Sequence, residues 1–286
     1  MANLKEIRSR IASVSSTMQI TSAMKMVSAA KLKKAQDAIT AVRPYADTLT
    51  ELLQNLSGSI EDASGSVYAT ERPVQKVLLV AITSNRGLCG GFNSNIIKEV
   101  VNQRDNNYAG KQVDVFTIGK KGNDILSKDF SVAENCGDVF DELTFANVAK
   151  VADQLMALYA SGGYDRIDLV YNRFKNAATQ IVTAEQFLPI FPVAVETASN
   201  SDYIYEPAQE EIVSTLIPKA LKTQLFKALR DSFASEHGAR MTAMHKATDN
   251  ATELRDQLKL TYNKARQAAI TNEILEIVGG AEALNG

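Results

Sequence analysis

The sequence predicts an α/β fold in which a long antiparallel coiled coil, formed by the N- and C-terminal helices, carries an inserted Rossmann-like α/β domain. Long segments with an apolar residue at every third or fourth position stand at both ends of the chain, and short apolar strands alternate with amphipathic helices between them. We expect an N-terminal helix at residues 1–57, a linker at 58–73, an α/β domain at 74–206 and a C-terminal helix at 207–286.

The N-terminal helix is predicted from a seven-residue repeat of sixteen positions, thirteen of them apolar. A repeat of this length specifies a left-handed coiled coil, because only supercoiling keeps the stripe against a partner. Three consecutive polar members, Thr21, Lys25 and Ser28, indicate either a register-setting layer or a stretch that faces another subunit. Pro44 is expected to kink the helix. The frame is Leu4, Ile7, Ile11, Val14, Met18, Thr21, Lys25, Ser28, Leu32, Ala35, Ile39, Val42, Ala46, Leu49, Leu53 and Leu56.

The first 36 residues hold seven basic side chains, one acidic side chain and several serines. This composition is typical of a mitochondrial presequence, and equally of a basic helix in a mature protein. We favour the basic helix, because the apolar repeat continues far beyond the length of a targeting segment. We therefore expect the chain to begin with functional structure, as in a bacterium.

The middle of the chain alternates strand and helix. The alternation predicts βαβ units and a mostly parallel sheet. After Pro73 the expected strands are Lys76–Thr83, Gln112–Ile118, Ile167–Tyr171 and, more weakly, Gln180–Phe187, and the expected helices are Phe92–Arg104 and Ala146–Ala160.

The C-terminal helix is expected to begin at Pro207. Pro218 is the last proline, and Gly238 is the single glycine between it and Gly279. A helix from Pro218 to Gly279 would be roughly 90 Å long, which no compact globule of this size requires. Antiparallel pairing with the N-terminal helix is expected to place Ile11 near Leu254. The C-terminal frame is Met244, Ala247, Ala251, Leu254, Leu258, Thr261, Ala265 and Ala268.

The sequence offers no catalytic or metal site that we can nominate. Cys89 and Cys136 form no CxxC pair, there are two histidines, and the net charge is −2. The Gly-rich loop at residues 84–93 could cradle a phosphate, but it does not fit GxGxxG and no GK[ST] follows, which favours a tight turn. The Gly-Lys-Lys-Gly run at 119–122 resembles a basic phosphate loop but lacks a following Ser or Thr, which favours a cap at the end of the second strand. We expect no cofactor, no nucleic acid and no direct membrane insertion.

The end of the C-terminal helix is apolar around most of its circumference. Ile270, Ile274 and Ile277 lie on one side, and Leu275 lies opposite. A lone helix with this surface would expose a sticky patch. The pattern therefore favours insertion of this end into a partner.

The chain resembles the family of F-type ATP synthase γ subunits over its whole length. The matching blocks lie at residues 7–13 with 20–27, at 84–93 (SNRGLCGGFN), at 240–244 with 247–250, and at 262–268 continuing into 270–281. The resemblance implies a central-stalk rotor that couples proton- or sodium-driven rotation of a membrane ring to conformational changes in catalytic β subunits, without catalysis by this chain. It also implies a peripheral location at the cytoplasmic face of the bacterial inner membrane.

The resemblance further implies three partners: an α3β3 hexamer, an ε subunit and a membrane c-ring. Two sets of contact residues are carried over by position. The set expected to face the β ring is Met24, Lys25, Arg240, Arg266, Gln267, Thr271, Glu273 and Glu276. The set expected to face ε or the membrane ring is Tyr203 and Tyr205.

Two other classes of function stay open at this stage. A nucleotide-binding enzyme with coiled-coil arms would need a phosphate loop with lysine and a convergent pair of ionisable groups. A static coiled-coil scaffold or nucleic-acid arm would bind DNA or RNA in a salt-sensitive way.

Overall fold

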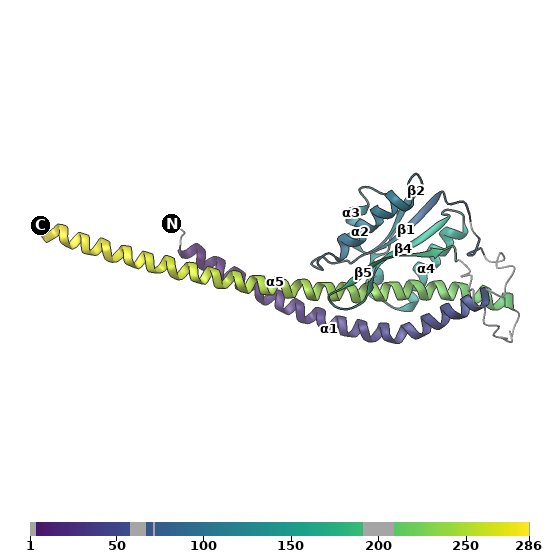
Figure 1. Ribbon diagram of the computed structural model, residues 1–286, viewed down its shortest axis with the longest axis horizontal. Helices are drawn as coiled ribbons and strands as arrows, with labels where there is room; N and C mark the ends of the chain where they lie inside the picture. Colours follow the sequence, from purple (N-terminus) through teal and green to yellow (C-terminus); the bar gives the residue numbers. More distant parts are fainter. Residues whose placement is uncertain (1–3, 58–66, 71, 191–208, 286) are drawn as a thin grey trace. The chain divides into compact units, whose positions relative to one another are not determined.

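The computed structural model describes residues 4–57, 67–70, 72–190 and 209–285. Two long helices, α1 (Leu4–Ser57) and α5 (Gln209–Asn285), stand at the two ends of the chain, and a mixed sheet with its own helices lies between them in the sequence, as predicted (Figure 1). The chain forms two compact units: residues 1–28 with 241–286, and residues 29–240. Each unit is described by itself below.

In the larger unit, a five-stranded sheet has the order β3-β2-β1-β4-β5. The strands are β1 (Lys76–Ile82), β2 (Gln112–Ile118), β3 (Val132–Asn135), β4 (Arg166–Phe174) and β5 (Gln180–Leu188). All neighbours are parallel except β4 and β5, which are antiparallel. The four predicted strands are confirmed, whereas β3 was not anticipated.

Helices cover both faces of this sheet. They are α2 (Phe92–Asn102), α3 (Lys120–Leu126) and α4 (Phe145–Ala160), with a π-helical turn at Gln103–Asn107 and a 3-10 turn at Gly137–Phe140. Helices α2 and α3 pack on one face, while α4 and α5 pack on the other. The two helices predicted here are confirmed within two residues at each end, and α3 is an additional short helix.

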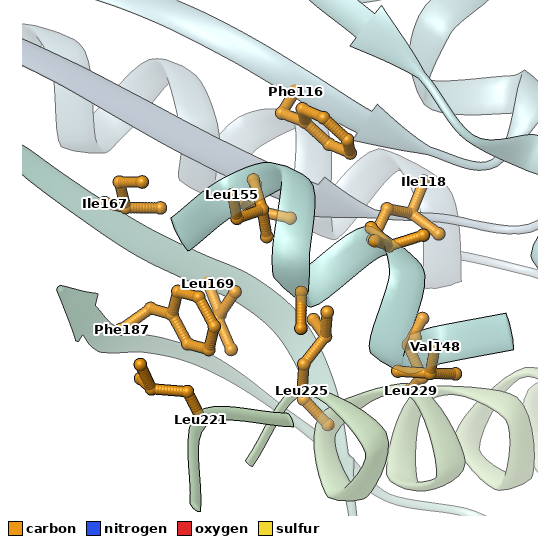
Figure 2. Close-up of a cluster of buried hydrophobic side chains, with 14 of the residues drawn as sticks. Phe116, Ile118, Val148, Leu155, Ile167, Leu169, Phe187, Leu221, Leu225 and Leu229 are labelled. Carbon is orange, nitrogen blue, oxygen red and sulfur yellow. The ribbon is translucent and has the colours of Figure 1, made fainter. Parts of the chain in front are cut away.

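The sequence of the central strand β1 is a continuous apolar run because both faces of the strand are buried. Leu78, Val80 and Ile82 point into the α4/α5 layer, and the residues between them point into the α2/α3 layer. Figure 2 shows the first layer, where Leu155 of α4 and Leu225 of α5 meet the strands. A strand buried on both faces has no polar positions to alternate with apolar ones.

The N-terminal frame is confirmed over residues 4–49, where every predicted position is buried or half-buried, and the helix continues through Pro44. Five of the eight predicted positions of the C-terminal frame are buried or half-buried. Met244 and Ala251 are buried and Leu258 and Ala265 half-buried, but Leu254 is 47% exposed. Ala247 is also half-buried, whereas Thr261 and Ala268 are exposed. Beside the three exposed positions, the next residues Arg255, Tyr262 and Ala269 are half-buried instead.

Contacts in the smaller unit fix the antiparallel register of α1 and α5. The Thr248 hydroxyl donates to that of Thr21 at 2.8 Å, and Arg8 donates to the Tyr262 hydroxyl at 2.8 Å. These contacts place Ile11 nearer to Leu258 than to exposed Leu254, so the predicted partner of Ile11 is displaced by about one turn. Arg255 and Tyr262 are half-buried where the predicted stripe had Leu254 and Thr261, because long polar side chains can cover a seam with their apolar parts.

Candidate functional site

The part of the fold that would hold a ligand in many α/β proteins is occupied by helix α5. Strand β1 has β2 on one side and β4 on the other, and crevices for ligands form at the carboxyl ends of strands where the order reverses in this way. The carboxyl end of β4 and the turn after it contact α5: the Ser235 hydroxyl donates to Asn172 O of β4 at 2.9 Å, and Gly238 packs against the Ala177 backbone beyond the strand.

Helix α5 is buried around its circumference at this level. Nine of the ten residues from 231 to 240 are buried, and Phe233 is half-buried. By contrast, α1 buries only Leu32, Ala35 and Ile39 over residues 31–40. A helix that is buried all round belongs to the core, so α5 is the central element of this unit and α1 covers it from outside.

Polar contacts join α5 to several parts of the α/β domain. The Gln224 amide donates to the Glu185 carboxylate at 2.7 Å and to Gln186 O at 3.1 Å. Arg230 donates to Leu143 O at 2.7 Å. Helix α1 contributes a partly exposed ion pair, Arg43 to buried Asp231 at 3.3 Å.

The Gly-rich loop at residues 84–93 packs against α5 through Cys89, Phe92 and Ala239, which form one buried cluster. Within the loop, the Ser84 hydroxyl donates to Arg86 O at 2.7 Å, and the Asn93 amide donates to Ser84 Oγ at 2.9 Å. The loop carbonyls thus serve contacts inside the chain, and the preference for a tight turn over a phosphate cradle is consistent with this packing. Burial raises the pKa of the Cys89 thiol, which disfavours the nucleophilic thiolate.

A buried charged pair adjoins this loop. Arg240 and Glu236 lie 2.5 Å apart, at 7% and 8% exposure. Burial raises the pKa of the Glu236 carboxyl, while the Arg240 guanidinium opposes the rise. Next to them, His237 is buried with neither ring nitrogen hydrogen-bonded within the described residues, and burial lowers its pKa to about 4. The histidine is therefore neutral near pH 7.

Seven of the eight residues expected to face the β ring lie in the smaller unit and reach solvent. Met24 and Lys25 are half-buried on α1, and Arg266, Gln267, Thr271, Glu273 and Glu276 are exposed on α5. The eighth, Arg240, is buried and bound by its own chain. Tyr203 and Tyr205 lie outside the described residues.

The end of α5 carries the exposed apolar surface that the sequence predicts. Large aliphatic side chains are exposed there, up to 71% at Ile277. The group comprises Ile270, Ile274, Leu275, Ile277 and Val278. Adjacent exposed aliphatic residues of this kind mark a protein contact surface more often than a solvated helix.

Among the residues that the structure describes, no group of three or more metal-ligating side chains converges, and no helix is long and apolar enough to cross a membrane.

The sequence did not single out Leu88 or Glu236. Leu88 has φ 64 and is 65% exposed, an uncommon combination for a bulky residue, and no local signal other than the flanking glycines points to it.

Comparisons with known proteins agree with this architecture. The model of the ATP synthase family matches residues 3–284. The ATP synthase gamma chain of Flavobacterium johnsoniae is 75% identical over 287 residues, covering 100% of both chains. The chain belongs to the ATP synthase gamma chain family.

Solved structures share this fold. A chain from the Tetrahymena thermophila mitochondrial ATP synthase central stalk and c-ring has a TM-score of 0.59 at 29% identity, covering 80% of this chain and 99% of its own. A chain from the Euglena gracilis mitochondrial ATP synthase rotor has a TM-score of 0.70 at 22% identity, covering 93% and 98%. The chain thus has bacterial relatives, and its fold recurs in mitochondrial ATP synthase structures.

Proposed function

We propose that this gamma chain is the central rotor of an F1F0 ATP synthase, in which it couples proton- or sodium-driven rotation of the membrane ring to conformational changes in the catalytic β subunits. The observation that carries the proposal, beside family membership, is the exposed aliphatic end of α5. Such a surface requires a partner that surrounds it, and a hexameric ring provides one.

The chain itself is proposed to be non-catalytic and to carry no cofactor. The reason is physical: the crevice where an α/β domain would bind a nucleotide holds residues 235–240 of α5 and the loop packed on it. The same filling argues against a nucleotide-binding enzyme with coiled-coil arms. ATP turnover by the purified chain that survives removal of trace α and β subunits would refute this part.

We assign the α3β3 hexamer, the ε subunit and the c-ring as partners, at the cytoplasmic face of the bacterial inner membrane. Residues 1–57 and 207–286 serve as the shaft, and 74–206 as the body. Met24 and Lys25 are proposed to face acidic loops of the β subunits. The contacts proposed nearer the helix end are Arg266, Gln267, Thr271, Glu273 and Glu276. Arg240 belongs to the set that the resemblance assigns to the β ring, but its burial makes a direct contact the weakest of these assignments. Tyr203 and Tyr205 are proposed to face ε or the membrane ring.

A pair of cross-links separates a rotor from a static scaffold. Cysteines replacing Thr21 and Thr248 stand where two hydroxyl oxygens are 2.8 Å apart, which is within reach of a disulfide. This bond joins two helices that turn together, so the assembled complex should keep its ATP hydrolysis rate. It replaces the Ile11 and Leu254 pair that the sequence alone suggested.

The second cross-link joins a cysteine at Met24 to a facing β loop. It should stop multisite hydrolysis, and reduction should restore it. A static scaffold would tolerate both bonds equally. Full formation of the Met24 bond with an unchanged rate would show that the chain does not rotate against β at this level.

A further inference from the structure

The buried Arg240 guanidinium reaches from α5 to the loop at residues 84–93. Its Nη2 donates to Arg86 O at 2.9 Å and to Gly87 O at 3.3 Å, while Nη1 is held by Glu236 at 2.5 Å. Arginine suits this position because its planar fork can bind a carboxylate on one side and carbonyls on the other. The two bound carbonyls immediately precede Leu88.

Leu88 needs support of this kind. A branched residue at φ 64 costs of the order of several-fold to tenfold in population relative to ordinary backbone, and it persists where the surroundings over-determine it. The next residue, Cys89, is 2% exposed and packs on Ala239 of α5. The loop is thus attached to α5 on both sides of the strained residue, by the arginine before it and by apolar packing after it.

We propose that Arg240 and Glu236 form an internal clamp, in which Arg240 is a positioning residue that holds the loop at residues 84–93 against α5 and keeps Leu88 in its exposed conformation. Loop and helix then move as one body. This role differs from the direct partner contact that the family resemblance implies for Arg240. It does not depend on the proposed rotor function, because the clamp lies wholly within one unit of the chain.

Cys89 offers a direct readout of loop opening. The chain has two cysteines, so Cys136→Ser leaves Cys89 as the single thiol. In the clamped loop this thiol is buried, so labelling of the folded full chain by an aromatic disulfide reagent should be slow. Losing a hydrogen-bonded buried charge shifts a local equilibrium by about ten- to a hundredfold, and Arg240→Met should accelerate labelling by that factor.

The electrostatic side effect of this substitution works against the expected result. The Arg240 charge lowers the pKa of Cys89, so its removal leaves less thiolate and would by itself slow labelling. An acceleration therefore reports access to the thiol and not its activation. Arg240→Lys keeps the charge but loses the planar guanidinium, so an acceleration in this variant also reports access to the thiol. Glu236→Gln removes the ion pair, but it also removes a charge that raises the pKa of Cys89, so this variant is compared only after the thiolate fraction is determined from the pH dependence of labelling. Both should accelerate labelling less than Arg240→Met does.

Arg230→Met is the matched control. Arg230 lies on the same helix and donates to Leu143 O, a carbonyl of a different loop. It should lower overall stability without accelerating Cys89 labelling beyond the change in global unfolding, which circular dichroism measures in parallel. Equal acceleration in Arg240→Met and Arg230→Met at equal stability would overturn the clamp. If Arg240→Met does not fold, Arg240→Lys is the deciding variant, and unchanged labelling of Cys89 in Arg240→Lys would refute the proposal.

Discussion

Gly238→Ala tests how closely α5 is packed against the α/β domain. An alanine Cβ at this position would lie 3.2 Å from both the Cα and the carbonyl oxygen of Ala177. These are backbone atoms of the turn between β4 and β5, whose Asn176 side chain accepts from the Thr179 amide at 2.7 Å. A turn held in this way cannot shift as easily as the end of a flexible side chain.

Two opposing effects set the magnitude. Replacing glycine by alanine inside a helix stabilises it by about 1 kcal/mol. Forcing a methyl group into a packed interior costs roughly 1–3 kcal/mol. We therefore expect Gly238→Ala to lower the free energy of unfolding by about 1 kcal/mol, measured by urea denaturation of the isolated chain with circular dichroism.

Gly279→Ala is the matched control, because nothing lies within 4 Å of the Cβ it would add. That variant should gain helix propensity without a clash, so its unfolding free energy should stay equal or rise slightly. A rise of about 1 kcal/mol in Gly238→Ala would refute the reasoning. It would mean that the turn at Ala177 yields and that α5 does not require a glycine at this crossing.

Two further predictions concern the core and pH. Leu225→Ala, in the fully buried layer, should destabilise by about 3–5 kcal/mol, whereas Leu254→Ala, 47% exposed, should change stability by less than about 0.5 kcal/mol in the same urea titration. Because burial lowers the pKa of His237 from 6.5 to about 4, the unfolded chain binds the extra proton between these values, and stability is lost as pH falls through this window. His237→Leu should flatten that slope in unfolding midpoints measured from pH 7 to pH 4, and an unchanged slope would contradict the assignment.

Much of the fold could be predicted because buried positions are occupied by apolar residues in a regular pattern along the sequence. Strand β1 is apolar at nearly every position because both of its faces are covered, and α1 keeps a strict repeat because one stripe faces α5. The elements that were not predicted, β3 and α3, lack such an apolar pattern. Strand β3 lies at the sheet edge with most of its side chains exposed, and α3 is a polar helix that follows Gly119, whose φ is 118.

The C-terminal frame shows where pattern reading fails for a physical reason. Leu254 and Arg255 are adjacent, and both continue a spacing of three and four residues from Ala251. Hydrophobicity selects the leucine, yet Arg255 is half-buried and donates to Met18 Sδ at 3.5 Å. Long polar side chains can cover a seam with their apolar portions, and composition alone does not reveal which residue does so.

The contact between Arg240 and the loop at residues 84–93 could not be predicted from the sequence for another reason. Arg240 and Arg86 are 154 residues apart, and no local pattern encodes their contact. A sequence reading can identify a Gly-rich loop after a strand, but it cannot tell whether a ligand or another part of the chain fills the space beside it. Here the filling element is α5, which carries a buried ion pair to the place where a phosphate would bind in other folds of this class.

This arrangement also accounts for how an α/β domain can serve as a mechanical part. A ligand crevice at the carboxyl ends of strands is usually closed by mobile loops, which would absorb any force applied to them. Helix α5 instead runs through that position, buried around its circumference from residue 231 to 240 and hydrogen-bonded to the end of β4 and to the loop that follows β1. A force on the domain therefore reaches the helix through short, buried contacts and not through flexible connections. The peripheral packing of α1 at the same level makes α5 the helix on which a substitution should disturb this joint most.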